Sequence, residues 1–368
     1  MSNTAVTEKR IHNFSAGPAV LPLEVLETAQ KELTCFKDEG ASVMEISHRS
    51  AAFEAVIFGA RDRLRRLMNI PENYEILFMQ GGASLQFCMI PMNFLEDGKP
   101  VQAINTGAWT TKAIKEINKQ GSCDSSLSSE ADNFRYIPKF TTEDVNANAS
   151  YVYITSNNTI AGTQWENFPD TNDVPLVCDM SSDILSRNID VSKFGLIFAG
   201  AQKNIGPSGV GIVIVRKDLL QKSKDSLPTF LNYNTHVKND SMFNTPPTFA
   251  IYMMGLVLEW LEDNGGISAI QEKNEKKAAK LYDFIDNSEF YQCKVKKDSR
   301  SNMNVVFRIN DDESLEKAFV SESKAKGLNG LKGHRLVGGL RASIYNNLPE
   351  ESVDALISFM KDFQEKNQ

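Results

Sequence analysis

The sequence predicts an α/β protein: a large domain with a mostly parallel sheet between helices, followed by a smaller C-terminal α+β domain. Between residues 22 and 216, short apolar runs alternate with amphipathic stretches, which indicates strands and helices in alternation. The apolar runs are nearly continuous, as expected for strands covered on both faces. Beyond residue 216 the pattern changes to two long helices and a mixed region of about a hundred residues.

Each element follows from this pattern. The expected strands of the large domain lie at residues 75–79, 101–105, 151–156, 176–180, 196–199 and 210–215. The expected helices between them lie at residues 23–36, 53–68, 85–95 and 111–119. Further helices are expected at 248–263, 267–285, 314–325 and 350–365, with strands at 304–309 and 339–344. We place the domain boundaries at 1–20 for an N-terminal segment, 21–265 for the large domain and 266–368 for the small one.

Composition excludes several classes of protein. The chain has 368 residues, of which 41% are apolar and 24% charged, and this excludes collagen-like, disordered and disulfide-scaffold proteins. Its net charge of -7 argues against nucleic acid or an anionic membrane as a partner. The N-terminus shows no targeting segment, and the longest apolar stretch, residues 250–261, is too short to span a bilayer. The five scattered cysteines lack zinc spacing, so we expect no metal site and reduced thiols in a cytoplasmic protein.

Two polar segments follow expected strands, where a ligand is expected in a parallel sheet. The turn at residues 80–84, Gln-Gly-Gly-Ala-Ser, leads into a helix, and its free N–H groups suit a phosphate. An ordinary Gly-rich turn explains the segment equally well. Asp179 ends an apolar strand and is placed to meet a ligand, although a helix N-cap is the alternative.

Lys203 stands after another expected strand, among the small residues of the segment FAGAQKNIGPSG. A lysine in a partly desolvated crevice has a lowered pKa, and its neutral amine can form a Schiff base. The alternative is a solvated loop lysine. The small neighbours favour the close approach of a ligand.

Cationic residues form two short groups. The only His-Arg pairs are His48-Arg49 and His334-Arg335, and Arg341 follows in a strand-like segment. The planar guanidinium suits bidentate capture of a carboxylate or phosphate. Structural salt bridges remain the alternative.

Trp109, which follows a strand, offers a flat face to a heteroaromatic ring or packs in the core. Asn244 and Thr245 begin a rigid turn, Asn-Thr-Pro-Pro, ahead of a helix. A Schiff-base lysine, a strand-end aspartate, a phosphate-binding turn and a stacking aromatic together indicate pyridoxal phosphate (PLP).

The sequence resembles the phosphoserine aminotransferases, a fold-type-I PLP-dependent family within the class V aminotransferases. The resemblance runs from residue 13 almost to the C-terminus. It rests on the segments NFSAGPAVLP, SVMEISHRS, GGASLQF, AQKNIGPSGVGIVIVR, SMFNTPPTFA and KGHRLVGGLRASIYN. It implies transamination between O-phospho-L-serine and 2-oxoglutarate in L-serine biosynthesis, and it leaves open whether 4-phosphohydroxy-L-threonine is also used.

The resemblance also implies roles for single residues. Lys203 would be the catalytic lysine that binds PLP and moves the proton. Cofactor contacts would come from Ala83, Ser84, Trp109, Thr159, Asp179, Ser181 and Gln202, with Asn244 and Thr245 supplied by the other subunit of a homodimer. Arg341 would hold the α-carboxylate of the small anionic substrates. His48, Arg49, His334 and Arg335 would hold the substrate phosphate or the side-chain carboxylate.

One departure and two rivals remain. Some members of the family carry an arginine in the Gly turn, whereas this chain has GGASLQF, so its phosphate contact would rest on backbone amides. Another fold-type-I enzyme, such as an alanine–glyoxylate transaminase or a desulfurase, is the alternative activity. A phosphate-binding regulatory or scaffold protein without PLP is the alternative from a different class.

Overall fold

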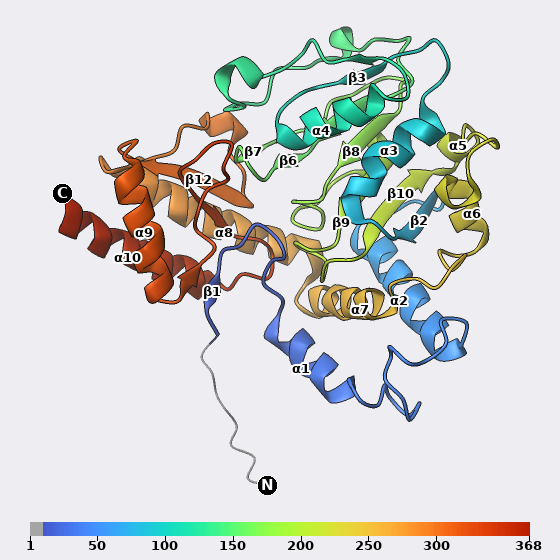
Figure 1. The fold of residues 1–368 in the computed structure, drawn as a ribbon, viewed down its shortest axis with the longest axis horizontal. Coiled ribbons are helices and arrows are strands. Elements are labelled where there is room, and N and C mark those ends of the chain that lie inside the picture. Colours follow the sequence, from blue (N-terminus) through green and yellow to red (C-terminus); the bar gives the residue numbers. More distant parts are fainter. Residues whose placement is uncertain (1–9) are drawn as a thin grey trace.

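A seven-stranded sheet forms the centre of the computed structural model, which describes residues 10–368 (Figure 1). Its strand order is β2-β10-β9-β8-β5-β3-β4. Neighbours from β9 to β4 pair in parallel, and β10 alone is antiparallel to both of its neighbours. The predicted mostly parallel sheet is therefore confirmed. Its strands are β2 (Tyr74–Met79), β3 (Val101–Ala103), β4 (Cys123–Asp124), β5 (Val152–Thr155), β8 (Leu176–Asp179), β9 (Leu196–Gly200) and β10 (Gly211–Arg216).

Helices cover both faces of this sheet because its strands are apolar on both sides. Ile76 and Phe78 of β2 pack into one apolar cluster with helices α2 and α7. Leu77 and Met79 of the same strand pack into a second cluster with α3 and α4. The helices of this part are α1 (Leu23–Glu32), α2 (Ala51–Leu67), α3 (Gly82–Phe94), α4 (Ala108–Ile117), α5 (Lys217–Leu220), α6 (Tyr233–Lys238) and α7 (Thr248–Asp263).

A separate apolar core lies in the C-terminal part, and helix α8 (Gly266–Asp286) contributes to both cores. Ile267 and Ile270 pack with the large sheet, whereas Ala278 and Leu281 pack in the C-terminal cluster. The remaining C-terminal elements are β11 (Tyr291–Gln292), β12 (Asn304–Ile309), α9 (Glu313–Ala325), β13 (Leu328–Asn329), β14 (Leu340–Ser343) and α10 (Glu350–Asn367). Among them, β11, β12 and β14 form an antiparallel sheet. The exact domain boundaries stay a prediction.

The N-terminal strand β1 (His12–Asn13) belongs with these C-terminal elements. It pairs in parallel with β13, and Phe14 is fully buried in the C-terminal cluster. Figure 1 accordingly shows the blue start of the described chain beside the orange and red elements. The segment after β1 then passes over the ends of the large sheet, where Gly17 approaches Lys203.

Several boundaries differ from those predicted. Helices α3 and α4 each begin three residues earlier than expected, at Gly82 and Ala108. Gly81 and Gly107 are their N-cap residues, so each helix follows its glycine directly, without a longer turn between them. Helix α1 ends at Glu32, short of the predicted residue 36. The two-residue strands, which include β6 (Asn157–Asn158) and β7 (Thr163–Gln164), were not predicted. Among residues 10–368, no helix is both long and apolar enough to cross a membrane.

Candidate active site

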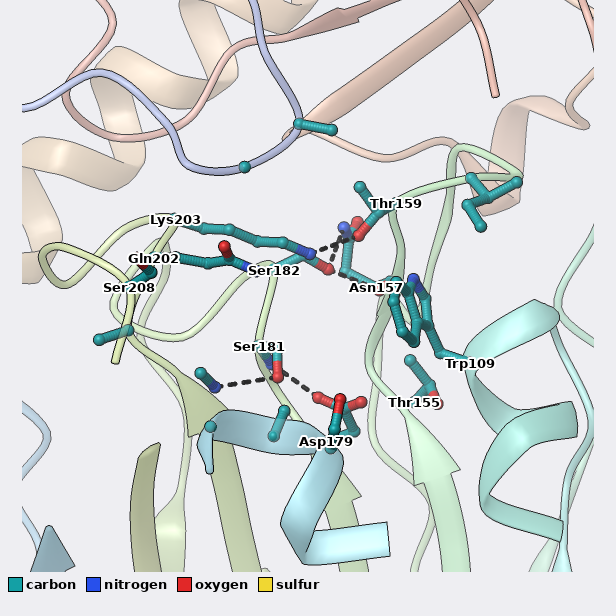
Figure 2. Close-up of a pocket in the computed structure, with 18 of the residues that line it drawn as sticks. Trp109, Thr155, Asn157, Thr159, Asp179, Ser181, Ser182, Gln202, Lys203 and Ser208 are labelled. Atoms are coloured by element: carbon teal, nitrogen blue, oxygen red, sulfur yellow. Dashed lines mark hydrogen bonds between the residues drawn. The ribbon is translucent and has the colours of Figure 1, made fainter. Parts of the chain in front are cut away.

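A cavity of about 540 Å³ lies at the carboxyl ends of strands β5, β8 and β9, where the sheet topology predicts a ligand. Figure 2 shows its interior, with Lys203 extending toward Thr159 and with Asp179 at the strand end. The sequence predictions converge here to a large extent. The predicted residues that line the cavity are Ala83, Ser84, Trp109, Thr159, Asp179, Ser181, Gln202, Lys203, His334 and Arg341.

Asp179 is the last residue of β8, and its carboxyl group faces the cavity while the residue is only 4% exposed. Its Oδ1 accepts a hydrogen bond from the backbone N–H of Ser181 at 2.9 Å. The hydroxyl of Ser181 in turn accepts from the backbone N–H of Gly200 at 3.1 Å. Burial raises the pKa of Asp179 above its ordinary value, although the hydrogen bonds from Ser181 oppose this. A buried carboxylate of raised pKa suits a cationic ring N–H.

Lys203 follows β9 by three residues and is only 7% exposed. Its Nζ donates a hydrogen bond to Thr159 Oγ1 at 2.7 Å. Burial lowers the pKa of Lys203 to about 8, against the opposing charge of Asp179. At this pKa a minor fraction of the amine is neutral near physiological pH, and a neutral amine is a nucleophile and a base.

The Gly-rich turn at residues 80–84 leads into α3. Gly81 and Gly82 have φ angles of 78° and 57°, which favour glycine. A Cβ on Gly81 would stand 2.7 Å from Leu85 Cβ. The amides of Ala83 and Ser84 lie in the first turn of the helix, where N–H groups have no acceptor within the helix. They line the cavity and suit a phosphate.

Thr159 also connects the amine to a buried arginine. Its backbone carbonyl accepts a hydrogen bond from Arg341 NH1 at 3.3 Å, and Arg341 is 9% exposed. The Arg341 Nε is buried without a hydrogen-bond partner among the described residues. His334 lines the same side of the cavity, and the pKa of its imidazole is lowered by burial and by nearby cations. The site thus contains the guanidinium of Arg341 and the imidazole of His334 as well as the carboxylate of Asp179.

Five predicted residues lie outside the lining of this cavity in the chain that the structure describes: His48, Arg49, Arg335, Asn244 and Thr245. All five are exposed or partly exposed. The Nε of Arg49 donates a hydrogen bond to Nε2 of His48 at 3.4 Å. The carbonyl of Thr245 accepts from Gln80 Nε2 at 3.1 Å, which places this turn near the Gly-rich turn.

Sequence reasoning missed several lining residues. Thr155 ends β5, and its hydroxyl shares a 2.8 Å hydrogen bond with Thr110. Asn157 Nδ2 donates to Ser182 Oγ at 2.8 Å, which fixes the loop after β5 against the loop after β8. The signal was present, because a run of polar residues follows an apolar strand at the predicted ligand edge. Phe87, which lies within an apolar helix, carried no such signal.

Comparisons with known proteins agree with this geometry. The family model described as aminotransferase class-V matches residues 11–356. The phosphoserine aminotransferase of Geobacillus kaustophilus is 57% identical over 359 residues, covering 97% of this chain and 99% of that protein.

Two solved structures extend the likeness to three dimensions. The phosphoserine aminotransferase of Bacillus circulans subsp. alkalophilus superposes with a TM-score of 0.95 at 53% identity, covering 98% of this chain and 99% of that one. The PLP-bound phosphoserine aminotransferase of Trichomonas vaginalis superposes with a TM-score of 0.90 at 41% identity, covering 96% and 100%.

Proposed function

This chain belongs to the class-V aminotransferase family, and from that premise we propose how its site works. The protein is a PLP-dependent transaminase that moves the amino group of O-phospho-L-serine to 2-oxoglutarate. The products are 3-phosphohydroxypyruvate and L-glutamate, and the reaction serves L-serine biosynthesis. The observation that carries the mechanism is the buried amine of Lys203 facing a cavity that also holds the buried carboxylate of Asp179.

The residues of the cavity fit the cofactor. The carboxylate of Asp179 suits the protonated ring nitrogen, and its Oδ1 already has a partner in Ser181 N–H. The first-turn amides of α3 suit the cofactor phosphate, with Gln202 and Ser84 beside them in the lining. The indole of Trp109 offers a flat face, and its Nε1 is buried without a hydrogen-bond partner among the described residues.

When bound, the cofactor supplies an electron-poor ring that stabilises negative charge at the α-carbon of the amino acid. The protein supplies the base. Lys203 Nζ would take the proton from the α-carbon of the amino donor. In the second half of the reaction it would return a proton to the α-carbon of the product amino acid. The lowered pKa of Lys203 keeps a neutral fraction of the amine available, and Thr159 orients it through the 2.7 Å hydrogen bond.

Substrate anions would be held by the cationic residues at the cavity. Arg341 would bind the α-carboxylate through its planar guanidinium, because its Nε has no hydrogen-bond partner among residues 10–368 and its NH1 is fixed by Thr159. His334 and Arg335 would contact the distal phosphate or carboxylate. The cavity lining supports the assignments of Arg341 and His334, and the proximity of the Arg335 charge to His334 supports that of Arg335.

We also propose a homodimer with shared active sites. Asn244, Thr245, His48 and Arg49 lie outside the lining of the cavity in their own chain and remain at least partly exposed. Residues of this chemistry gain a role if they complete the cavity of a second copy. A cytoplasmic location is a further expectation, supported by cysteines that form no disulfide within residues 10–368.

The experiment is a transamination assay on the purified, PLP-loaded protein. We expect L-glutamate to form from O-phospho-L-serine and 2-oxoglutarate, with far weaker turnover of plain L-serine. The same assay with 4-phosphohydroxy-L-threonine decides whether that compound is also a substrate. Preference for an unphosphorylated donor would contradict the proposed function.

A further inference from the structure

Lys112 lies on α4, one turn after Trp109, and nothing above gives it a role. Its Nζ stands 3.9 Å from the centroid of the Trp109 ring. Side chains on a helix lean toward its N-terminus, so Lys112 extends back over the end of α4 that borders the cavity. Lys112 is exposed and is not one of the residues that line the cavity, so its ammonium is accessible beside Trp109, which does line it.

The charges around this position share one sign. Arg341, Arg335 and Lys112 all act on His334, and each lowers the pKa of its imidazole. None of the salt bridges within residues 10–368 includes Lys112, Arg335 or Arg341. By contrast, Lys119 on the next part of the chain pairs with Glu116 at 2.7 Å. A group of cations without protein counter-ions is the electrostatic signature of a site for an anion.

We propose that Lys112 is a further substrate-binding residue, whose ammonium contacts the distal anionic group of the substrate beside His334 and Arg335. The inference rests on the proposed function for the identity of that group. A phosphate dianion has three acceptor oxygens and needs more than one cationic donor, and lysine supplies a compact point charge for it. The contact with Trp109 places the ammonium over the indole face and leaves its other N–H groups free to donate to an anion.

Three variants separate this role from a purely structural one. Lys112→Met keeps the length of the stem and removes the charge, and Lys112→Arg keeps the charge. Lys115→Met is the matched control, because Lys115 is an exposed lysine one turn further along the same helix. All three are measured as PLP-loaded enzymes, with O-phospho-L-serine and with L-alanine, which lacks a distal anion.

We expect Lys112→Met to raise the KM for O-phospho-L-serine about tenfold, as for the loss of one charged hydrogen bond, with kcat changed less than about twofold. The slow turnover of L-alanine and the visible spectrum of the cofactor should stay as in the wild type. Lys112→Arg should recover most of the lost affinity, and Lys115→Met should match the wild type. An unchanged KM in Lys112→Met would overturn the proposal. So would equal losses for both amino donors with an altered spectrum, since these would indicate that Lys112 only orients Trp109.

A binding measurement keeps this test independent of the reaction. Inorganic phosphate is titrated calorimetrically into PLP-loaded wild type and PLP-loaded Lys112→Met, so that the cofactor occupies its own phosphate site. About tenfold weaker binding to the variant supports the role of Lys112 even if O-phospho-L-serine is not a substrate. Equal affinities contradict the role whatever the turnover. Failure of the wild type to use O-phospho-L-serine would contradict the proposed function alone.

Discussion

Two buried lysines in this protein show how surroundings decide the role of an amine. Lys277 is 2% exposed, and its Nζ lies within hydrogen-bond distance of the carbonyls of Ile344, Tyr345 and Leu348, at 2.7–3.1 Å. Within the described part of the chain, the Nζ of Lys203 has a single hydrogen-bond partner, Thr159 Oγ1, and it faces a cavity. Burial lowers the pKa of both amines. Of these two lysines, Lys203 alone faces a cavity that can hold a ligand, so it alone is placed to act on a substrate.

The partner carboxylate can be tested at the same scale. Asp179→Asn keeps the shape of the side chain and removes its charge, so the ring nitrogen of the cofactor would lose a charged partner. We expect kcat/KM to fall about ten- to a hundredfold, as for the loss of one charged hydrogen bond. Steady-state transamination measures the change, and the thermal stability of the variant is recorded as a control. Wild-type kcat/KM in a folded, cofactor-loaded variant would remove Asp179 from the mechanism.

At the scale of elements, the loop after β14 joins the parts that carry the site. The backbone N–H of Asn346 in this loop donates a hydrogen bond to Oδ1 of Asn204 at 3.1 Å, and Asn204 is the residue after Lys203. Asn274 of α8 donates to Asn346 Oδ1 at 2.8 Å, and Lys277 of the same helix binds the carbonyls of this loop. Helix α8 therefore fixes the loop that follows the strand of Arg341, and this loop is hydrogen-bonded to the segment that carries Lys203.

Lys277→Met tests this connection through its pH dependence. Burial lowers the pKa of Lys277 to about 7 from an ordinary 10.5. Between these values the unfolded chain binds more protons than the folded one, so the contribution of Lys277 to stability rises with pH across this window. The variant should lack this rise and should be destabilised by about 1–3 kcal/mol, because buried carbonyls lose their donor.

The measurement is thermal unfolding of the PLP-loaded protein between pH 7 and 10. Lys276→Met is the matched control, since Lys276 is exposed and pairs with Glu350 at 3.1 Å. The control should keep the wild-type dependence of Tm on pH. Identical pH profiles for Lys277→Met and the wild type would show that Lys277 does not titrate in this window.

The sequence predicts elements well where the apolar pattern is long, and poorly where it is short. Helix α7 and strand β12 have the predicted bounds, because each has a continuous periodic pattern. Two-residue strands such as β6 have no period to detect. Lys203 and Asp179 could be found because each follows an apolar strand. The contact of Thr159 with Arg341 joins residues 182 positions apart in the sequence, and only the fold brings them together.

At the scale of the whole molecule, we propose that the site of one chain is completed by a second copy. Four predicted residues lie outside their own chain's cavity lining, at exposed or partly exposed positions ahead of α2 and α7: His48, Arg49, Asn244 and Thr245. Sequence reasoning could name them through the resemblance, and the fold of one chain does not place them in the cavity lining. A symmetric dimer places the same surface of each copy against the other, so it would complete both cavities at once.

Mixing two inactive variants tests the shared site. Lys203→Ala and Arg49→Ala each disable the site to which that residue contributes. If Arg49 serves the cavity of the other subunit, a mixed dimer carries one site with both defects and one intact site. Unfolding and refolding the mixture with PLP should then restore up to about a quarter of the wild-type activity, since about half of the dimers are mixed. No recovery from a mixture that sedimentation shows to contain mixed dimers would contradict shared sites.

The most direct test of the central claim is to identify the lysine that holds the cofactor. Borohydride reduction of the PLP-loaded protein makes the covalent link permanent, and peptide mass spectrometry locates it. The account predicts a pyridoxyl adduct on Lys203, together with loss of the visible absorbance and of turnover in Lys203→Ala. An adduct on another residue, such as the buried Lys277, or wild-type turnover by Lys203→Ala would contradict it.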